Sequence, residues 1–309
     1  MQEFVHYPVM LNEAVDALKC ESGKLYIDAT LGGGGYSELI LKRIQPAGRL
    51  ISFDVDIDAI NASKNRLGSY DNLTIVNDSY TNIKNYLTEN NIEKIDGGVV
   101  FDLGASYPQL TSATRGFSFS KDAELDMRFN QSADFSAYDV INTYREDELV
   151  KIFSEYGEER FSKRIARAIV ETRKLQAIKT TKELADIIIK ATPKIKSNIH
   201  PATRVFQAVR IEVNDELRNI KNTLNDVLTF MSFGAILSVV TFHSLEDRIV
   251  KQFMRYHSSK CNCEPNQAVC SCPPPKLEII TKKPITASNR EIVENPPSRS
   301  AKLRIARRK

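Results

Sequence analysis

The sequence predicts an α/β fold in which a Rossmann-like, mostly parallel sheet is interrupted by an inserted all-helical domain. Up to residue 107, short apolar segments alternate with segments of helical periodicity, which is typical of a parallel sheet with helices on both faces. From residue 108 to about 232 no convincing strand is found, which indicates a helical insertion. An apolar segment at residues 235–242 then returns the chain to the sheet. We therefore expect a core of residues 1–107 and 206–309, with residues 108–205 as the insertion.

The first part of the sheet is predicted from four apolar segments and the polar residues that follow them. A short helix around Asn12 precedes the first strand. Strands are expected at residues 25–27, 49–54, 73–76 and 97–103. The polar residues at or just after their carboxyl ends are Asp28, Asp54, Tyr80 and Asp102. Because the carboxyl ends of parallel strands meet at one edge of a sheet, these side chains are expected to converge there.

The insertion is predicted from amphipathic spacing and from helix-start signals. Residues 158–174 place apolar side chains on one helix face and basic side chains on another, namely Arg160, Lys163, Arg164 and Arg167. Thr180 and Glu183 form a capping box for the next helix, and Pro201 can start a further one. We expect the insertion to have a small core of its own.

The last third of the chain is predicted to complete the sheet. Residues 243–247 indicate a helix start that Ser244 or Asp247 can cap. His243 suggests either acid–base chemistry or a structural cap, whereas His6 and His200 are expected to be structural. Residues 258–300 resemble a surface loop, and residues 301–306 alternate in the manner of a half-exposed final strand.

Four glycines at residues 32–35 lie between the first strand and a helix and indicate a ligand-binding turn. With Asp54 about 20 residues further on, this turn fits two adenosine-containing cofactors, nicotinamide dinucleotide and S-adenosylmethionine. A dinucleotide site prefers a third glycine where this chain has Ser37, and Asp28 would repel an anionic pyrophosphate. Because Asp28 would not repel a cationic sulfonium, the sequence favours S-adenosylmethionine over the cofactor of a dehydrogenase.

Asp102 has two open roles at the end of the fourth strand. If the methyl acceptor is an exocyclic amine, a carboxylate that accepts its N–H bonds favours the geometry of attack and helps to take the proton. In the other interpretation, Asp102 contacts only the cofactor.

Composition and charge indicate a soluble cytoplasmic protein with basic residues gathered at its carboxyl end. The first ten residues do not have the pattern of a signal peptide, and the longest near-apolar run is too short to span a bilayer. Net charge is only +4, but the last twelve residues contain no acid and six basic residues. These are Arg299, Lys302, Arg304, Arg307, Arg308 and Lys309. Such a tail indicates either a polyanionic partner such as nucleic acid or a solubilising segment.

Four of the five cysteines lie close together, at Cys261, Cys263, Cys270 and Cys272. Four thiols in a loop poor in apolar residues suit a structural zinc ion. The C-x-C spacing is less usual for zinc than C-x-x-C, so reduced free thiols are slightly favoured. Both interpretations stay open, and no metal ligand is assigned.

Seven segments together carry a resemblance to a known family: residues 28–37, 101–106, 115–119, 125–128, 200–208, 242–251 and 295–304. In this order they resemble the RsmH (MraW) family of 16S rRNA cytosine-N4 methyltransferases. The resemblance implies a class I S-adenosylmethionine-dependent methyltransferase fold, with a cytidine N4 in the decoding region of 16S rRNA, within the 30S subunit, as acceptor. By position it carries the family's cofactor contacts onto Gly34, Gly35, Tyr36, Asp54, Tyr80, Asp102 and Gln109. It also implies that the helical insertion helps to bind the RNA.

Two positions depart from the family's usual pattern. Tyr36 stands where the family usually has His, and Tyr107 stands where it usually has a second Ser. We still expect Tyr36 to bind the cofactor, because at a position that follows the glycines the backbone contact matters more than the side chain. Two alternatives remain: a methyltransferase of DNA amines, whose Asp/Asn-Pro-Pro-aromatic motif is missing at residues 102–105, and a catalytically silent RNA-binding or ribosome-assembly factor.

Overall fold

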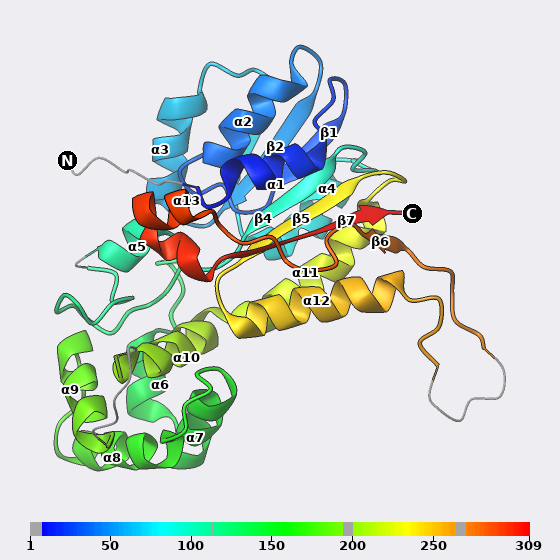
Figure 1. Cartoon of the computed structure of the whole chain (residues 1–309). Helices are drawn as coiled ribbons and strands as arrows, with labels where there is room; N and C mark the ends of the chain where they lie inside the picture. The colour runs from blue at the N-terminus through cyan, green and yellow to red at the C-terminus, as the bar shows by residue number, and fades with distance from the viewer. Residues whose placement is uncertain (1–7, 113, 194–199, 264–269) are drawn as a thin grey trace. The chain divides into compact units, whose positions relative to one another are not determined.

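A seven-stranded sheet forms the centre of the first of two units into which the chain folds (Figure 1). This unit comprises Met1–Gly104 and Leu217–Lys309, and the second unit comprises Ala105–Glu216. The computed structural model describes residues 8–112, 114–193, 200–263 and 270–309. A mostly parallel sheet with a helical unit inserted into its sequence confirms the predicted fold class.

The strands follow the order β3-β2-β1-β4-β5-β7-β6 across the sheet. Their bounds are β1 (Leu25–Asp28), β2 (Arg49–Asp54), β3 (Leu73–Asn77), β4 (Gly98–Asp102), β5 (Ile236–Thr241), β6 (Leu277–Ile279) and β7 (Lys302–Arg308). The strands β1 to β5 pair in parallel, whereas β7 runs antiparallel to both of its neighbours, β5 and β6. The parallel strands therefore bring their carboxyl ends, including Asp28, Asp54 and Asp102, to one edge of the sheet.

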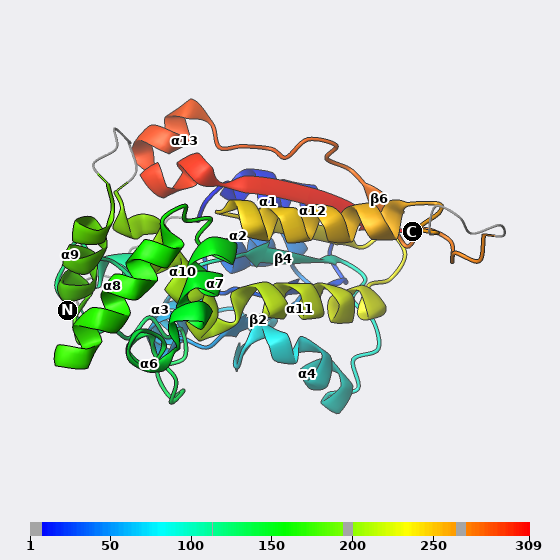
Figure 2. The same cartoon turned by 90° about the horizontal axis from the view of Figure 1, so that it is seen from below.

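Helices cover both faces of this sheet, which is why its central strands are apolar on both sides. One face packs against α1 (Leu11–Leu18), α2 (Gly35–Ile44) and α3 (Ile57–Leu67). The other face packs against α4 (Ile83–Glu89), α11 (Glu216–Phe230) and α12 (Ser244–Ser258). In Figure 2, α1 and α2 lie on the opposite side of the sheet from α4 and α11. None of the helices in the described part of the chain is long and apolar enough to cross a bilayer.

The carboxyl-terminal part of the sheet differs from the prediction in two ways. Residues 258–300 were expected to be surface loop, but they include β6, α13 (Asn289–Glu294) and η2 (Pro296–Ser300). The final strand was expected to be half-exposed, yet Leu303, Arg304, Ile305 and Ala306 are all buried. The reason is that β6, which is too short to give a sequence signal, pairs with β7 on the side opposite to β5.

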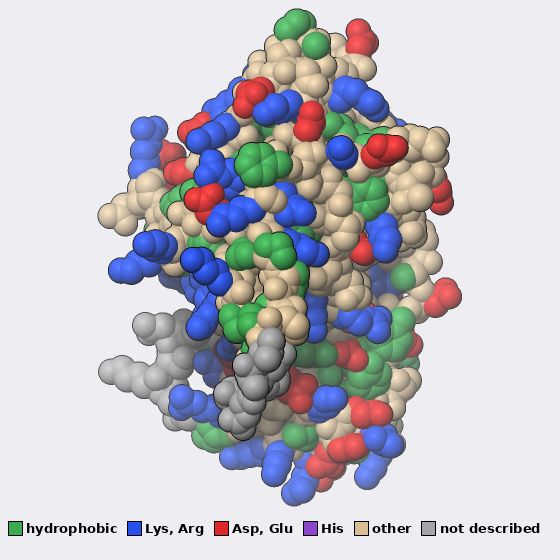
Figure 3. Space-filling model, turned by 90° about the vertical axis from the view of Figure 1, so that its right-hand side faces the viewer, with side chains coloured by type: hydrophobic (Ala, Val, Ile, Leu, Met, Phe, Trp, Pro, Cys, Tyr) green, Lys and Arg blue, Asp and Glu red, His purple; other side chains and the backbone are tan. Residues whose placement is uncertain are grey.

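Three basic residues of β7, Lys302, Arg304 and Arg307, bind acidic groups of the same unit, whereas Arg308 donates to the carbonyl oxygens of Lys276 and Lys309. Arg304 Nε lies 2.6 Å from Asp247 Oδ1, and Lys302 Nζ lies 3.3 Å from Asp247 Oδ2. Burial raises the pKa of Asp247, but the hydrogen bonds and charges of Arg304 and Lys302 outweigh it and lower that pKa below its usual value. Arg307 pairs with Glu278 at 2.6 Å. Both Lys and Arg and Asp and Glu side chains lie on the face shown in Figure 3.

The second unit is helical in the part of it that the structure describes, apart from one isolated bridge between Glu124 and Thr180. Its helices are α5 (Tyr107–Thr111), α6 (Ala137–Thr143), α7 (Glu146–Glu155), α8 (Ser162–Leu175), α9 (Thr181–Ala191) and α10 (Ala202–Asn214). The helices α6 to α10 enclose a separate core, as predicted. The boundary expected at residue 205 falls inside α10, and this helix packs on α6 and α7, so the observed unit extends to Glu216.

A long segment without helix, residues 114–136, is held in place by polar contacts within the second unit. The buried Arg115 donates from Nη2 to the carbonyl oxygens of Arg128 and Phe129 at 3.0 and 3.1 Å. Asn214 accepts from the Phe129 N–H and donates to the Met127 carbonyl, both at 2.8 Å. Two of the segments that carry the family resemblance, 115–119 and 125–128, therefore help to build this unit.

Gly116→Ala is expected to destabilise the second unit by about 3 kcal/mol, because a side chain does not fit there. Gly116 has a φ of 67°, and an added Cβ would lie 2.3 Å from the Glu124 carbonyl oxygen. Gly234→Ala is the matched control in the first unit, since Gly234 has a φ of 86° but no atom within 4 Å of an added Cβ. The control should lose only about 1 kcal/mol, from backbone strain alone. Equal losses of urea-unfolding free energy in the two variants would contradict the steric argument.

Candidate functional site

The glycine turn joins β1 to α2 and presents backbone N–H groups at the carboxyl edge of the sheet. Gly32 and Gly34 have φ angles of 50° and 76°, which glycine adopts without steric cost. A Cβ on Gly35 would lie 2.6 Å from the Pro8 ring, so only glycine fits at this position. Within the described residues, no hydrogen bond uses the N–H groups of Gly35 and Tyr36. These two donors at the start of α2 are available to an acceptor on a ligand.

Asp28 is fully buried at the end of β1 and organises the turn. Its Oδ1 accepts from the Thr30 N–H at 3.1 Å, and its Oδ2 accepts from the Ser37 hydroxyl at 2.7 Å. The Ser37 hydroxyl also lies 2.8 Å from that of Ser52. Burial raises the pKa of Asp28 to about 6, although the hydrogen bonds from Ser37 and Thr30 act to lower it. Since none of its surface is exposed, Asp28 is not available for contact with a ligand and could affect one only through its charge.

Asp54 closes β2 and ties it to the glycine turn. Its Oδ2 accepts from the Gly32 N–H at 2.8 Å, and its Oδ1 accepts from the Asp56 N–H at 2.9 Å. Burial raises the pKa of Asp54 to about 6, although these backbone hydrogen bonds act in the opposite direction. Asp56 accepts from the Asp58 N–H and caps α3.

Asp102 ends β4 with a side-chain oxygen that is buried and lacks a partner. Its N–H donates to Thr30 Oγ1 at 2.7 Å, whereas its Oδ1 has no hydrogen-bond partner among the described residues. Burial raises the pKa of Asp102 well above its usual value, and the charges of Asp28, Glu246 and Glu291 raise it further. Such an oxygen is costly to bury until a hydrogen-bond donor or a cation reaches it. Thr30, Glu246 and Glu291 were not predicted at this edge.

The two tyrosines predicted to bind the cofactor lie in different environments. The Tyr36 side chain is buried in the core of the first unit, and its hydroxyl donates to the Val9 carbonyl. Only its backbone is therefore available to a ligand, which fits the expectation that backbone contact matters at this position. Tyr80 begins η1 (Tyr80–Asn82), and its ring meets Phe101 edge to face with ring centres 6.0 Å apart.

The two remaining positions carried over from the resemblance lie in the second unit. Gln109, in α5, accepts from the Ser106 N–H through Oε1 at 2.9 Å, and its own N–H lies 3.4 Å from Ser106 Oγ. The side chain of Tyr107 lies outside the described part of the chain. The structure thus places the glycine turn, Asp54, Tyr80 and Asp102 in the first unit and Gln109 in the second, and the cofactor-binding role of each of them stays a prediction.

His243 is the cap of α12, which confirms the structural interpretation of this residue and corrects the expectation that Ser244 or Asp247 would cap the helix. Its Nδ1 accepts from the Glu246 N–H at 3.4 Å. Glu246 in turn accepts from the N–H groups of Phe242 and His243 at 2.7 and 3.2 Å, which completes a capping box. Asp247 is unavailable as a cap because it pairs with β7.

His200 has the structural role that was expected of it. Its ring stacks on Phe119 with ring centres 4.3 Å apart, and its Nδ1 accepts from the Ala202 N–H at 3.2 Å. Both contacts lie within the second unit. His6 lies outside the described residues.

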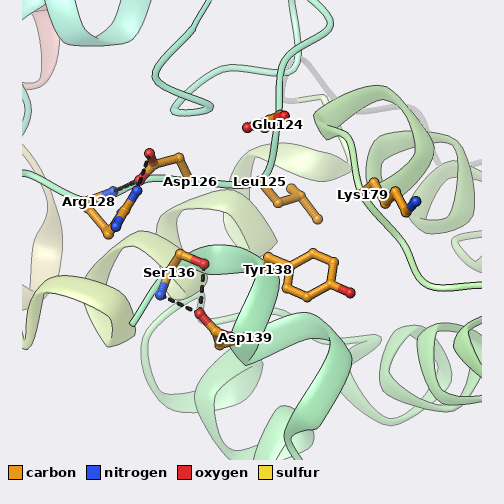
Figure 4. A pocket seen from close by; sticks show the side chains of 8 residues that line it. All are labelled: Glu124, Leu125, Asp126, Arg128, Ser136, Tyr138, Asp139 and Lys179. Atoms are coloured by element: carbon orange, nitrogen blue, oxygen red, sulfur yellow. Dashed lines mark hydrogen bonds and ion pairs between the residues drawn. The ribbon is translucent and has the colours of Figure 1, made fainter. Parts of the chain in front are cut away.

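A cavity of about 330 Å³ lies in the second unit and is lined partly by one of the segments that carry the resemblance (Figure 4). Its lining residues are Glu124, Leu125, Asp126, Arg128, Ser136, Tyr138, Asp139 and Lys179. Asp126 accepts three hydrogen bonds from Arg128, and Asp139 accepts two from Ser136. These carboxylates are already hydrogen-bonded to residues of the cavity wall. The cavity therefore offers a ligand fewer unsatisfied polar groups than the carboxyl edge of the sheet does.

Comparison of the sequence with known proteins shows that the chain is similar to methyltransferases. A family model described as the MraW methylase family matches residues 3–309. The relative from Clostridium botulinum (strain Loch Maree / Type A3) is 48% identical over 99% of both chains and is named Ribosomal RNA small subunit methyltransferase H. Relatives of the same name from Caldicellulosiruptor bescii and Clostridioides difficile are also 48% identical, over 98% of this chain and 99% of theirs.

Proposed function

Because the chain belongs to the MraW methylase family, we propose that it transfers a methyl group from S-adenosylmethionine to the exocyclic N4 of a cytidine in the decoding region of 16S rRNA. The names of its relatives support rRNA of the small subunit as the substrate. The proposal further places this rRNA within the 30S particle and the reaction in the cytoplasm. The class I fold, with a glycine turn after β1, supports S-adenosylmethionine as the donor. The observation that carries the chemistry is the buried, unpartnered Oδ1 of Asp102.

The acidic edge of the sheet fits a cationic methyl donor. The carboxylates of Asp28, Asp54 and Asp102 end three neighbouring strands, and burial raises the pKa of each. An anionic pyrophosphate would add to this repulsion, whereas the sulfonium and ammonium groups of S-adenosylmethionine relieve it. When bound, S-adenosylmethionine supplies an electrophilic methyl group. Asp54 and the N–H groups of Gly35 and Tyr36 would hold it, with further contacts from Gly34, Tyr80 and Gln109.

Asp102 is the residue proposed to act on the methyl acceptor. The lone pair of a cytosine amine is conjugated with the ring, which makes the amine a weak nucleophile. A carboxylate that accepts an N–H of this amine favours attack by the lone pair, and the same carboxylate can take the proton that is lost. The base must leave its stack to reach the site, which costs a few kcal/mol and least where it is already unpaired.

The basic face of α8 is proposed to hold the RNA backbone. Lys163 and Arg164 of α8 and Arg160, which lies just before this helix, are exposed, and none of them forms an ion pair among the described residues. Arg167, on the same face, lies 3.7 Å from Glu146 and is partly neutralised. In the carboxyl-terminal tail Lys302, Arg304 and Arg307 are paired with acids, so α8 is proposed as the main phosphate-binding surface and the tail as a secondary one.

The double variant Lys163→Ala/Arg164→Ala is expected to bind 30S subunits about five- to tenfold more weakly. The dependence of log K on log salt should also become shallower by about 1.5, because each lost phosphate contact removes about 0.7–0.9 from the slope. Lys64→Ala, at an exposed lysine of α3 in the first unit, is the matched control and should leave both values unchanged. Filter binding at several salt concentrations measures them, and an unchanged slope in the double variant would exclude phosphate contacts there.

A direct assay tests the proposed reaction. The protein is incubated with tritiated S-adenosylmethionine and 30S subunits that lack the modification, and the RNA is digested to nucleosides. Label in N4-methylcytidine is the expected result, and its absence under conditions in which the cofactor binds would refute the proposal. If calorimetry shows no binding at millimolar S-adenosylmethionine, a catalytically silent RNA-binding factor becomes the better interpretation. Transfer to DNA but not to 30S subunits would favour a methyltransferase of DNA amines.

A further inference from the structure

Four cysteines that the proposed methyl transfer does not use, Cys261, Cys263, Cys270 and Cys272, lie close together between α12 and β6. Figure 1 shows where these two elements lie in the fold. Their Sγ atoms all lie within 4.8 Å of one another. Cys263 Sγ lies 3.4 Å from Cys272 Sγ, and Cys270 Sγ lies 3.7 Å from Cys261 Sγ. The fold therefore brings two C-x-C pairs into one cluster, which the spacing alone did not establish.

These separations fit tetrahedral coordination of one ion by four sulfurs. With a Zn–S bond of about 2.3 Å, neighbouring sulfurs of a regular tetrahedron are about 3.8 Å apart. A disulfide requires about 2.05 Å between its sulfurs, so neither of the close pairs is one. A set of four thiolates favours Zn²⁺ over hard cations such as Mg²⁺ or Ca²⁺, which prefer oxygen ligands.

The backbone around the cluster supports thiolate ligands. The Asn262 N–H donates to Cys272 Sγ at 3.1 Å, and such a bond stabilises negative charge on a sulfur that binds a metal. The Asn262 side chain donates to the Tyr256 carbonyl at 2.9 Å, and Ser259 Oγ donates to the Cys261 carbonyl at 2.6 Å. The first C-x-C pair is thereby connected to the end of α12.

The loop has no apolar core that could hold it in this shape. None of the described residues at 255–263 and 270–276 is buried. Nevertheless, the chain must return close to α12, because the Lys276 N–H donates to the His257 carbonyl at 2.8 Å directly before β6. Small segments that cannot bury a core commonly depend on a bound metal for their folding energy.

We propose that Cys261, Cys263, Cys270 and Cys272 bind one Zn²⁺ ion, which closes the loop and fixes the approach of the chain to β6. Protein sulfur fills all four positions, so no position remains for water or substrate and the site is structural. The proposal concerns a part of the chain outside the acidic edge of the sheet and does not depend on the proposed methyl transfer.

The metal content of the purified protein tests this site. The full chain, prepared with reductant but without chelator, should contain about one zinc per chain by mass spectrometry of the elements. Cys261→Ser/Cys272→Ser should lose at least about nine-tenths of it, because two of the four ligands are missing. Cys20→Ser is the matched control, since Cys20 follows α1 and lies outside the cluster, and it should keep its zinc. Protein reloaded with Co²⁺ should show the visible absorption of tetrahedral cobalt thiolate, which the double variant should lack.

Thiol accessibility separates loss of metal from loss of fold. In the native protein the four clustered thiols should react slowly with a thiol reagent, and a zinc chelator should expose all four while the circular dichroism spectrum stays unchanged. Limited proteolysis should then cut within residues 259–276. Metal-free protein with four freely reactive thiols, two disulfides by intact mass, or iron in place of zinc would each overturn the proposal. Calorimetry with S-adenosylmethionine on the double variant distinguishes these outcomes from a failure of the proposed function, because cofactor binding should persist.

Discussion

Asp102→Asn and Asp102→Ala are expected to lower methyl transfer to 30S subunits by about 10²–10⁴-fold while the protein stays folded. Asn keeps an oxygen that accepts a hydrogen bond, but it cannot carry a negative charge or take a proton. Ala removes the acceptor oxygen as well. Neither variant should be less stable than the wild type, because Asp102 Oδ1 is buried without a partner and other acids surround it. Initial rates with tritiated S-adenosylmethionine, together with urea unfolding, measure the two effects.

The same variants decide between the two roles that the sequence left open for Asp102. If Asp102 acts on the acceptor amine, kcat falls at saturating S-adenosylmethionine and the cofactor Kd changes little. If it contacts only the cofactor, the Kd rises and kcat recovers at saturation. Asp147→Asn, at an exposed acid of the second unit, is the control and should retain full activity. Wild-type activity in both Asp102 variants would remove this residue from the mechanism.

The sheet and its acidic edge could be predicted because the relevant signals are local. Three apolar segments end in Asp28, Asp54 and Asp102. Each of them predicts both a strand and the position of its carboxyl end. The capping box at Thr180 and Glu183 is likewise a local pattern, and the structure confirms it. These features depend on neighbours within a few residues, which a single sequence displays directly.

The contacts that were missed join residues far apart in the chain. Glu291, near the carboxyl end, accepts from the Met10 N–H at 2.7 Å and adds its charge to the edge occupied by Asp102. Arg304 of β7 forms a buried ion pair with Asp247 of α12, although it was expected to belong to an exposed basic tail. No periodicity links such partners, so only the three-dimensional packing reveals them.

Raising the pH from 5 to 7 is expected to weaken the unliganded protein and to strengthen its binding of S-adenosylmethionine. Burial raises the pKa of Asp28 and of Asp54 to about 6, so the folded state holds protons that the unfolded chain releases near pH 4. Stability is therefore greatest below the unfolded pKa and falls as the pH rises through the folded pKa. For the fully buried Asp28 the loss between pH 5 and pH 7 is about 1.3 kcal/mol, and the rest of a total loss of about 3 kcal/mol falls below pH 5. Urea unfolding at pH 5, 6 and 7 measures it.

Cofactor affinity should change in the opposite direction, because a cationic donor favours the ionised carboxylates. With a pKa of about 6, roughly one-tenth of the Asp54 side chains are ionised at pH 5, so a donor that requires this charge binds about tenfold more weakly there than at pH 7. Asp28 adds to this effect through its charge. S-adenosylhomocysteine, which lacks the sulfonium, is the matched control ligand and should show a smaller change. Asp54→Asn should flatten the pH dependence for S-adenosylmethionine, whereas equal pH profiles for the two ligands would show that the acidic edge does not select the positive charge of the donor.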